Sequence, residues 1–477
     1  MDSGPKLPNE PRDPRRFCDE QMRRPLHAHD AASLNAVLAA AMQSGHTEAK
    51  AWVATTAIRA PLPPEARIRL ALRLAHAMRG EDAFGVLIAD PAVFSGESAM
   101  ADAVSALRLI VLNNGTPEWI KEVARMLGRR LCRISDDGGE RTGFAFPSQS
   151  PLQPPASPCE VMLAPGAPPG ASAVIERHMR SIEDSLVKAG TPEVRLYRDV
   201  LVNRDGQVWR ADGSMIRNEW RVLPEASRIA AATAPRVEEA VLAICPNNAY
   251  HWFADWMTSM AWRFAEGVPD LPVLIRDDAL PFVPQSLELA GGSALSCIPV
   301  GNAVAVGRLY MTGRPGVRLD ADGAAGGVFR RMVATALDGT EQPRHGPVYI
   351  SRRDSRRRKA TNDEALEEAL VAEGLRPITL TGMSLRQQIA AMRGATAVVA
   401  PHGAGLCMTF AALPGTPVFE IMPHMAGTLR NRLCFARMSR MLGHRHRIWL
   451  EDCDQQREHW TADVPRILAS VREFLAG

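Results

Sequence analysis

Polar side chains at the ends of apolar runs in this sequence could bind a phosphate group. One such segment is Pro401-His402-Gly403-Ala404-Gly405, which follows the apolar run ATAVVA and precedes a helical pattern. Its glycines would let the backbone approach a ligand closely, and the free N–H groups that begin the next helix could bind an anion. A diphosphate suits this place. A tight strand-to-helix turn with a space-filling histidine fits the pattern equally well.

A second phosphate-binding candidate is the basic segment from Ser351 to Lys359, directly after the apolar run PVYIS. Guanidinium groups bind phosphate oxygens through paired hydrogen bonds. Arg352 lies nearest the predicted strand end and is therefore the best phosphate ligand, while most of the other arginines are expected to be solvated. No aromatic residues alternate with these arginines, which argues against a nucleic-acid surface.

Two further polar residues in this half of the chain have both a binding and a structural interpretation. Glu420 lies near the end of the apolar run TPVFEI. Its carboxylate could accept hydrogen bonds from both hydroxyls of a ribose, or it could pair with an arginine. Asn362 begins the helical pattern NDEALEEALVAEG and is most simply the N-cap of that helix.

A candidate general base lies upstream, in the segment His251-Trp252-Phe253-Ala254-Asp255 that follows the apolar run EAVLAIC. If a helix begins near Tyr250, the side chains of His251 and Asp255 lie four residues apart on one face. Either could take a proton from an acceptor hydroxyl. For this segment alone, a helix with one buried histidine and a surface aspartate is the simpler interpretation.

Several other chemistries lack their sequence patterns or have weak ones. No GxGxxG follows a predicted strand and no GxxxxGK[ST] loop is present, so a dinucleotide oxidoreductase and a P-loop NTPase are disfavoured. The eight cysteines form no CxxC pair, which argues against a zinc site. Asp320-Ala321-Asp322 matches the DxD pattern of metal-dependent sugar transfer, but a turn is its simpler interpretation.

The elements that must position these residues alternate along the chain. Short apolar runs alternate with helical patterns after about residue 190, which predicts an α/β fold with parallel sheets. Asp205-Gly206 and Asp212-Gly213 predict tight turns between strands. We expect two Rossmann-like domains preceded by a small α-helical domain. The predicted boundaries are a disordered N-terminus at 1–29, a helical domain at 30–146, a Pro-rich linker and lead-in at 147–189, an acceptor-side domain at 190–342, a donor domain at 343–445, and a C-terminal segment with a closing helix at 446–477.

Composition places the chain among ordinary globular proteins. Hydrophobic residues make up 46% of it and charged residues 23%, and the formal net charge is +3, so charge does not call for a nucleic-acid partner. The start of the sequence lacks the apolar stretch of a signal peptide, and no apolar run reaches the ~18 residues that span a membrane. We expect a cytoplasmic protein with reduced cysteines, and peripheral contact with the inner membrane stays open.

Taken together and in order, these segments resemble a known enzyme family. YISRRDSRRRKATNDEALEEALVAEG, MSLRQQIAAMRGATAVVAPHGAGL and LPGTPVFEIMP are similar to the family 61 glycosyltransferases, which include capsular-polysaccharide-type enzymes of bacteria. HWFADWM resembles the His-Trp/Phe-x-x-Asp segment of the same family. The resemblance covers about residues 190–445. The family pattern maps onto His251, Asp255, Ser351, Arg352, Arg358, Asn362, His402, Gly403, Gly405 and Glu420.

The resemblance implies a GT-B architecture, an inverting mechanism and no obligatory metal or other cofactor. It implies a nucleotide-sugar donor, for which we expect a UDP-linked sugar, and a glycan or lipid-linked glycan acceptor. After His-Gly-Ala-Gly-Leu the family commonly continues with Thr-Asn, whereas this chain has Cys407-Met408.

The predicted mechanism is a single displacement at the anomeric carbon of the donor sugar. Asp255 is the first choice for the base, and His251 is the second choice or its orienting partner. The predicted donor-binding residues are Ser351, Arg352, Arg358, Asn362, His402, Gly403, Ala404, Gly405 and Glu420. A non-catalytic module that binds nucleotide sugars or glycans, and a metal-dependent transferase that uses Asp320 and Asp322, remain as alternatives.

Overall fold

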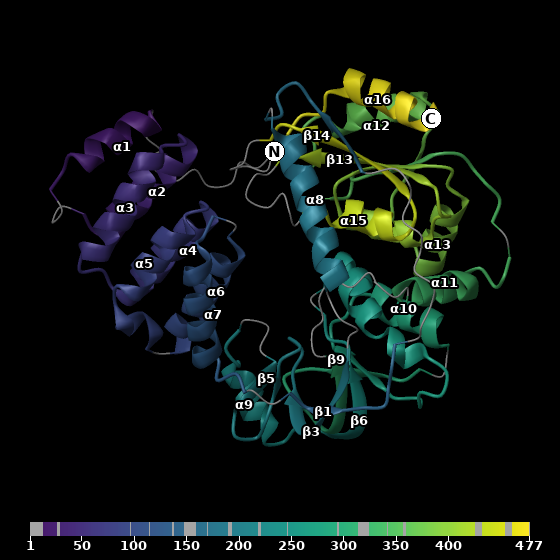
Figure 1. The fold of residues 1–477 in the computed structure, drawn as a ribbon, viewed down its shortest axis with the longest axis horizontal. Coiled ribbons are helices and arrows are strands. Elements are labelled where there is room, and N and C mark those ends of the chain that lie inside the picture. The colour runs from purple at the N-terminus through teal and green to yellow at the C-terminus, as the bar shows by residue number, and fades with distance from the viewer. Residues whose placement is uncertain are drawn as a thin grey trace. The chain divides into compact units, whose positions relative to one another are not determined.

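The structure is a computed structural model, and it divides the chain into two compact units, Met1–Asp136 with Gln207–Ile229 and Asp137–Gly206 with Ala230–Gly477 (Figure 1). The residues it describes are 13–25, 29–95, 97–113, 115–135, 138–146, 159–168, 170–188, 193–217, 221–245, 247–292, 295–312, 324–340, 342–355, 359–424, 432–453 and 460–476.

The first unit is mainly helical. Its helices are α1 (Pro14–Met22), α2 (Ala31–Gln43), α3 (Thr47–Arg59), α4 (Pro64–His76), α5 (Gly80–Ile88), η2 (Pro91–Phe94), α6 (Glu97–Leu112), α7 (Glu118–Leu131) and α9 (Glu225–Ala231). Alanine and leucine side chains at helical spacing form its core. Helix α1 lies within the segment predicted to be disordered, and it is ordered because Asp13 caps its first turn and Cys18 is fully buried. The strands β4 (Val208–Trp209) and β5 (Met215–Arg217) form a hairpin, with Gly213 at a φ of +79° in the predicted turn.

The second unit contains a mixed sheet with the strand order β3-β9-β6-β7-β8, and β1 pairs with β3. The strands are β1 (Glu140–Arg141), β3 (Val194–Val202), β6 (Arg236–Leu242), β7 (Val273–Arg276), β8 (Cys297–Val300) and β9 (Val304–Thr312). The neighbours β9, β6, β7 and β8 run parallel, whereas β1 and β9 run antiparallel to β3. The helical elements of this part are η3 (His251–Met257), η4 (Ala261–Phe264), α10 (Phe282–Gly291) and α11 (Ala324–Ala336).

The other sheet of this unit is parallel throughout, with the order β11-β10-β12-β13-β14-β2. Its strands are β2 (Glu160–Leu163), β10 (Val348–Ile350), β11 (Arg376–Ile378), β12 (Val398–Pro401), β13 (Pro417–Pro423) and β14 (Arg445–Glu451). Its helices are α8 (Ala171–Lys188), α12 (Asp363–Ala372), α13 (Leu385–Gly394), η5 (Ala404–Ala411), α15 (Cys434–Met441) and α16 (Val464–Ala476). Helix α16 coincides with the predicted closing helix.

Helices cover both faces of the parallel sheet. Phe419, Ile421 and Trp449 share one apolar cluster with α12 and α16. Met422, Ile448 and Leu450 share another with α8 and α15, which lie on the other side of β13 and β14 in Figure 1. This alternation follows from the period of two in a strand, and burial on both faces explains the apolar runs that predicted these strands. The α/β fold class is therefore confirmed.

Two elements lie in the segment 147–189, which the sequence predicts to be a linker and lead-in. Strand β2 extends the parallel sheet beside β14, and Arg447 on β14 donates to Glu160 on β2 (Nε to Oε2, 2.6 Å). Helix α8 packs on the same sheet. The Pro-rich residues 147–158 lie outside the described residues. Among the helices that the structure describes, none is long and apolar enough to cross a membrane.

Candidate functional site

The predicted phosphate-binding residues meet at one edge of the parallel sheet. Strands β10 and β12 pair side by side, so Arg352 and His402 both follow strand ends at this edge. Arg352 donates from Nη1 to the carbonyl oxygen of His402 at 2.7 Å and from Nη2 to Ser355 Oγ at 2.7 Å. The two segments separated in the sequence are thus joined by a guanidinium group.

Gly403 is required at its position by the same contact. A Cβ atom built on Gly403 would lie 1.7 Å from Arg352 Nη1, so the guanidinium occupies the space that any side chain would need. The φ of Gly403 is 171°, which any residue adopts, so the need for glycine comes from this close approach. Ala404 begins η5 and is exposed, and Gly405 packs near Ile350 and Leu380.

A buried network of hydrogen bonds lies directly behind this turn. Glu420 accepts from His402 (Oε1 to Nδ1, 2.5 Å) and from His446 (Oε2 to Nε2, 3.0 Å). His446 Nδ1 also forms a hydrogen bond with Ser439 Oγ at 2.8 Å, so both of its ring nitrogens have partners. Burial alone would raise the pKa of Glu420, but the hydrogen bonds from the two imidazoles lower the pKa to about 2. Glu420 is therefore a carboxylate at every ordinary pH.

In this structure the carboxylate of Glu420, which the sequence suggested as a ribose ligand, is buried and bonded to two histidines. Its side chain has an exposed fraction of 0%, and both oxygens accept from histidines. His402, and not Glu420, lies in the turn itself, and the centroid of its ring is 5.2 Å from that of Phe435. Because His402 Nδ1 is held by Glu420, a contact of its ring with a phosphate would have to use Nε2.

Other predicted donor residues have structural partners. Ser351 Oγ donates to Glu367 Oε2 at 2.5 Å, and Arg353 pairs with the same carboxylate at 2.9 Å while its side chain stays 54% exposed. Asn362 is at the N-cap position of α12, as predicted, but its side chain does not cap the helix. Its amide instead exchanges two hydrogen bonds with the backbone of Ala462, at 2.8 and 2.9 Å. Arg358 lies outside the described residues.

The candidate base residues lie on η3, which is a π-helix from His251 to Met257. Short π-helical segments are rare and occur often at functional sites. His251 Nδ1 donates to Asp255 Oδ2 at 2.7 Å, so the predicted shared face is confirmed. The His251 side chain is 51% exposed and Asp255 is 13% exposed. Trp252 anchors the helix by donating to Ser286 Oγ on α10 at 2.7 Å.

Residues that the sequence did not single out connect η3 to the turn at His402. Tyr250 accepts a hydrogen bond from Arg437 on α15 at 2.6 Å. Its ring also contacts Phe435 at 5.5 Å, and Phe435 contacts His402. Burial, together with the charges of neighbours that include Asp255, raises the pKa of the Cys407 thiol. The two candidate segments are therefore neighbours, joined by one aromatic layer.

Some of these residues left a weak signal in the sequence. His446 lies on β14, which is buried on both faces, and nothing in its sequence identifies a partner for the His446 ring. Cys407 and Met408, where the chain departs from the family pattern, are 0% and 3% exposed. The departure thus falls on side chains of η5 that face the core. Among the described residues, no group of three or more His, Cys, Asp or Glu side chains is arranged to hold a metal ion, and Asp320 and Asp322 lie outside them.

The comparison with protein families agrees with the arrangement of these segments. Residues 249–419 match the family model described as Glycosyltransferase 61. The match begins just before η3, includes both the SRR segment and the PHGAG turn, and ends one residue before Glu420. No curated protein matches the chain. A family 61 domain supports glycosyl transfer as the activity, and the geometry brings the segments of that domain together. Residues 249–419 are therefore a glycosyltransferase domain of family 61.

Proposed function

We propose that the protein is an inverting glycosyltransferase that moves a sugar from a UDP-linked donor to a hydroxyl of a glycan or lipid-linked glycan. The two sheets of the second unit would be the two Rossmann-like domains of a GT-B enzyme, with the donor on the parallel sheet. Surface or capsular polysaccharide biosynthesis is the process that this family membership favours. The observation that carries the proposal is the guanidinium of Arg352, seated over Gly403 and bonded to the carbonyl of His402.

The donor diphosphate would lie at this edge of the sheet, in a site formed by Arg352 and the turn from His402 to Gly405, which we call the donor cradle. Arg352 supplies a fixed positive charge, and the first N–H groups of η5 supply donors at a helix start. These groups are already in place before the reaction, so they favour the diphosphate as negative charge builds on it. We propose that they meet this charge without an obligatory metal.

His402 would contribute through the ring nitrogen that Glu420 does not hold. A carboxylate bonded to one nitrogen of an imidazole fixes the ring and stabilises positive charge on it, as in a catalytic triad. Glu420 would therefore orient His402 toward the diphosphate, with His446 holding the second carboxylate oxygen. This role replaces the direct ribose contact that the sequence suggested for Glu420.

The acceptor hydroxyl would lose its proton to the pair on η3. His251 is the more exposed member, so its Nε2 is the atom that an acceptor can reach, while Asp255 holds the Nδ1–H. This assignment reverses the order that the sequence suggested. The acceptor oxygen attacks the anomeric carbon through an oxocarbenium-like state, the bond to the diphosphate oxygen breaks, and its electron pair leaves with UDP.

The donor site is tested by calorimetry with UDP and a panel of UDP-sugars, together with transfer and hydrolysis assays. Arg352→Ala should weaken UDP binding about tenfold or more, and transfer should fall at least as far. Arg353→Ala is the matched control, because Arg353 pairs with Glu367 and is half exposed. Equal UDP affinity in the two variants would remove the proposed cradle.

The same assays separate the enzyme from the alternatives. UDP-sugar binding without transfer or hydrolysis would favour a non-catalytic binding module. Loss of activity in a chelator, with recovery on adding a divalent metal, would favour the metal-dependent alternative. For the base, full activity in His251→Gln with loss in Asp255→Asn would return that role to Asp255.

A further inference from the structure

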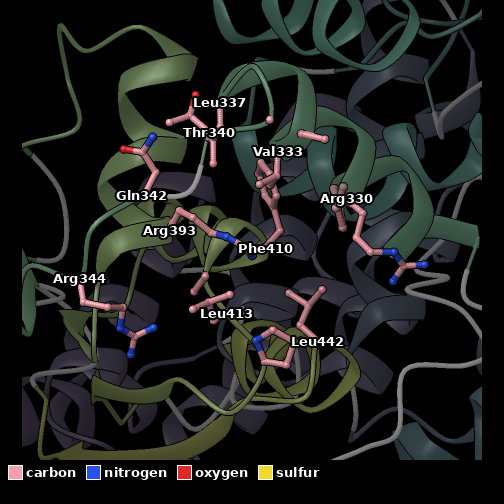
Figure 2. Close-up of a pocket in the computed structure, with 16 residues that line it drawn as sticks. Arg330, Val333, Leu337, Thr340, Gln342, Arg344, Arg393, Phe410, Leu413 and Leu442 are labelled. Atoms are coloured by element: carbon pink, nitrogen blue, oxygen red, sulfur yellow. The ribbon is translucent and has the colours of Figure 1, made fainter.

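A cavity with a volume of about 670 Å³ lies in the second unit (Figure 2). This volume falls within the range of small-molecule sites, roughly 300–1,000 Å³. Helix α11 contributes Val333 to its wall, the turn after α11 contributes Leu337, and the end of η5 contributes Phe410. Segments further along the chain contribute Leu413 and Leu442. The wall is thus mainly aliphatic and aromatic.

The cavity is at the opposite end of the parallel sheet from the proposed donor cradle. Arg344 precedes β10, Arg393 precedes β12, Leu413 precedes β13 and Leu442 precedes β14. The cradle follows the other ends of β10 and β12. Because these strands are parallel, the two sites lie at opposite edges of one sheet. A molecule bound in the cavity would therefore not be the donor at the cradle.

The charged residues of the cavity are all cationic. Arg330, Arg344 and Arg393 line it, and none of the described residues that line it is acidic. Figure 2 shows the side chain of Arg393 extending toward Phe410, with Arg344 at the edge of the cavity and Arg330 directed away. Asp338, on the loop after α11, is 85% exposed and pairs with Arg386.

An apolar cavity with arginines at its rim complements a molecule with an apolar body and an anionic head. Guanidinium groups bind both carboxylate and phosphate through paired hydrogen bonds, but a terminal phosphate carries a charge of about −1.5 to −2 at pH 7 and so suits two arginines better than a carboxylate does. We propose that this cavity binds an amphiphile with an aliphatic chain and a terminal phosphate, with the chain on Phe410 and Leu413 and the phosphate at Arg393 and Arg344.

The occupant would also contact an element of the transfer site. Phe410 stacks on Phe329 at 4.7 Å and contacts Phe253 at 5.2 Å, and Phe253 lies on η3 between His251 and Asp255. At the other end of η5 is the turn that forms the donor cradle. Eight residues of 3₁₀-helix span about 16 Å at about 2 Å per residue. The ligand would thus touch η5 without blocking the cradle.

The test is calorimetry of the full chain with dodecyl phosphate as monomers, in the presence of saturating UDP. Dodecyl maltoside is the uncharged comparison, and inorganic phosphate is the comparison without a chain. We expect that, of the three compounds, only dodecyl phosphate binds. Arg393→Gln should lower the affinity for dodecyl phosphate about tenfold. Leu413→Glu, which places a negative charge in the wall, should weaken binding at least as much. Arg472→Gln is the matched control, because Arg472 is exposed on α16.

The proposal is overturned if dodecyl maltoside binds equally well, if Arg393→Gln binds dodecyl phosphate as the unchanged chain does, or if UDP displaces dodecyl phosphate. Thermal unfolding of each variant shows that the fold is kept, and Leu413→Glu supports the assignment only if its midpoint is unchanged. UDP binding and transfer are measured in the same samples. If both persist while dodecyl phosphate fails to bind, this proposal alone is lost and the proposed function stands.

Discussion

Two of the histidine–carboxylate pairs that the structure describes in the second unit have nearly the same hydrogen bond and very different surroundings. His402 and Glu420 are joined at 2.5 Å, and their side chains are 5% and 0% exposed. His251 and Asp255 are joined at 2.7 Å, and their side chains are 51% and 13% exposed. The same two functional groups therefore occur once inside the core and once at the surface.

The difference in burial gives the two pairs different roles, one structural and one in proton transfer. A buried carboxylate is stable only while its hydrogen bonds are made, so Glu420 must be a permanent anion that fixes two rings. A half-exposed imidazole can meet an acceptor and exchange a proton with it. Changing each carboxylate to its amide should therefore damage different properties of the protein, and the following predictions use that contrast.

The largest effect is expected for Asp255→Asn, which removes the charge that supports proton transfer on η3. We expect kcat to fall by a factor of roughly 10² to 10⁴, with UDP affinity and the unfolding midpoint nearly unchanged. Steady-state kinetics and calorimetry measure these quantities. Asp199→Asn is the control, because Asp199 is exposed and its φ of 48° suits asparagine. Undiminished kcat in Asp255→Asn would end the proposed role of the exposed pair.

Glu420→Gln should instead reduce stability. A glutamine cannot accept from both imidazoles, because its NH₂ group would face one of the ring N–H groups. Breaking a buried charged network in this way costs about 3–5 kcal/mol of unfolding free energy. Urea unfolding measures this loss, and Asp255→Asn is the matched comparison, with a change under about 1 kcal/mol. Similar unfolding free energies for the two amide variants would contradict the contrast between the pairs.

The buried His444 sharpens the comparison, because no carboxylate among the described residues is bonded to its ring. His444 is 1% exposed and bonds the carbonyl of Thr409 through Nε2 at 3.0 Å. Burial lowers the pKa of His444 to about 4 from 6.5. The unfolded chain therefore binds this proton more tightly than the folded chain does. The contribution of His444 to the unfolding free energy is fully present above about pH 6.5 and is lost as the pH falls toward 4. The pKa of Glu420 is lowered from 4.5 to about 2 by folding, so its contribution to the unfolding free energy is present above about pH 4.5 and is lost as the pH falls toward 2.

Two separate acid steps are thus expected. His444 should remove on the order of 2 kcal/mol between about pH 7 and pH 5, before Glu420 contributes. Urea unfolding at several pH values measures the steps, and His444→Gln should abolish the first without the second. An NMR titration of the folded chain in which His444 protonates near its ordinary pKa would contradict this account.

The smallest effect compares two glycines of the PHGAG turn. Gly403→Ala should push the Arg352 guanidinium away, because a Cβ atom there lies 1.7 Å from its Nη1. The far end of an arginine side chain moves easily, so the fold should survive and UDP affinity should fall about tenfold. Gly405→Ala meets Ile350 and Leu380 at 3.0 and 3.1 Å, so it should lower the unfolding midpoint slightly and keep UDP affinity. Equal UDP affinities would show that Arg352 does not form the cradle.

Local patterns in the sequence were sufficient for the α/β fold class, the strands beside PVYIS and ATAVVA, and the pairing of His251 with Asp255. Each depends on a short-range rule, such as apolar runs for strands buried on both faces or the spacing of side chains along a helix. The order of the segments also led to the family. The same rules did not anticipate β2, which pairs with β14 far along the chain, or α1, whose few apolar side chains are buried against α2 and α3.

The sequence by itself determined which chemical groups the protein has and, through the family pattern, the kind of reaction to expect. Only the tertiary structure decided which groups meet. It seated Arg352 over Gly403, turned Glu420 inward between His402 and His446, and placed Tyr250 against Phe435. These contacts join residues brought together by strand pairing and helix packing, and burial then decides whether a histidine–carboxylate pair holds a ring in place or exchanges a proton.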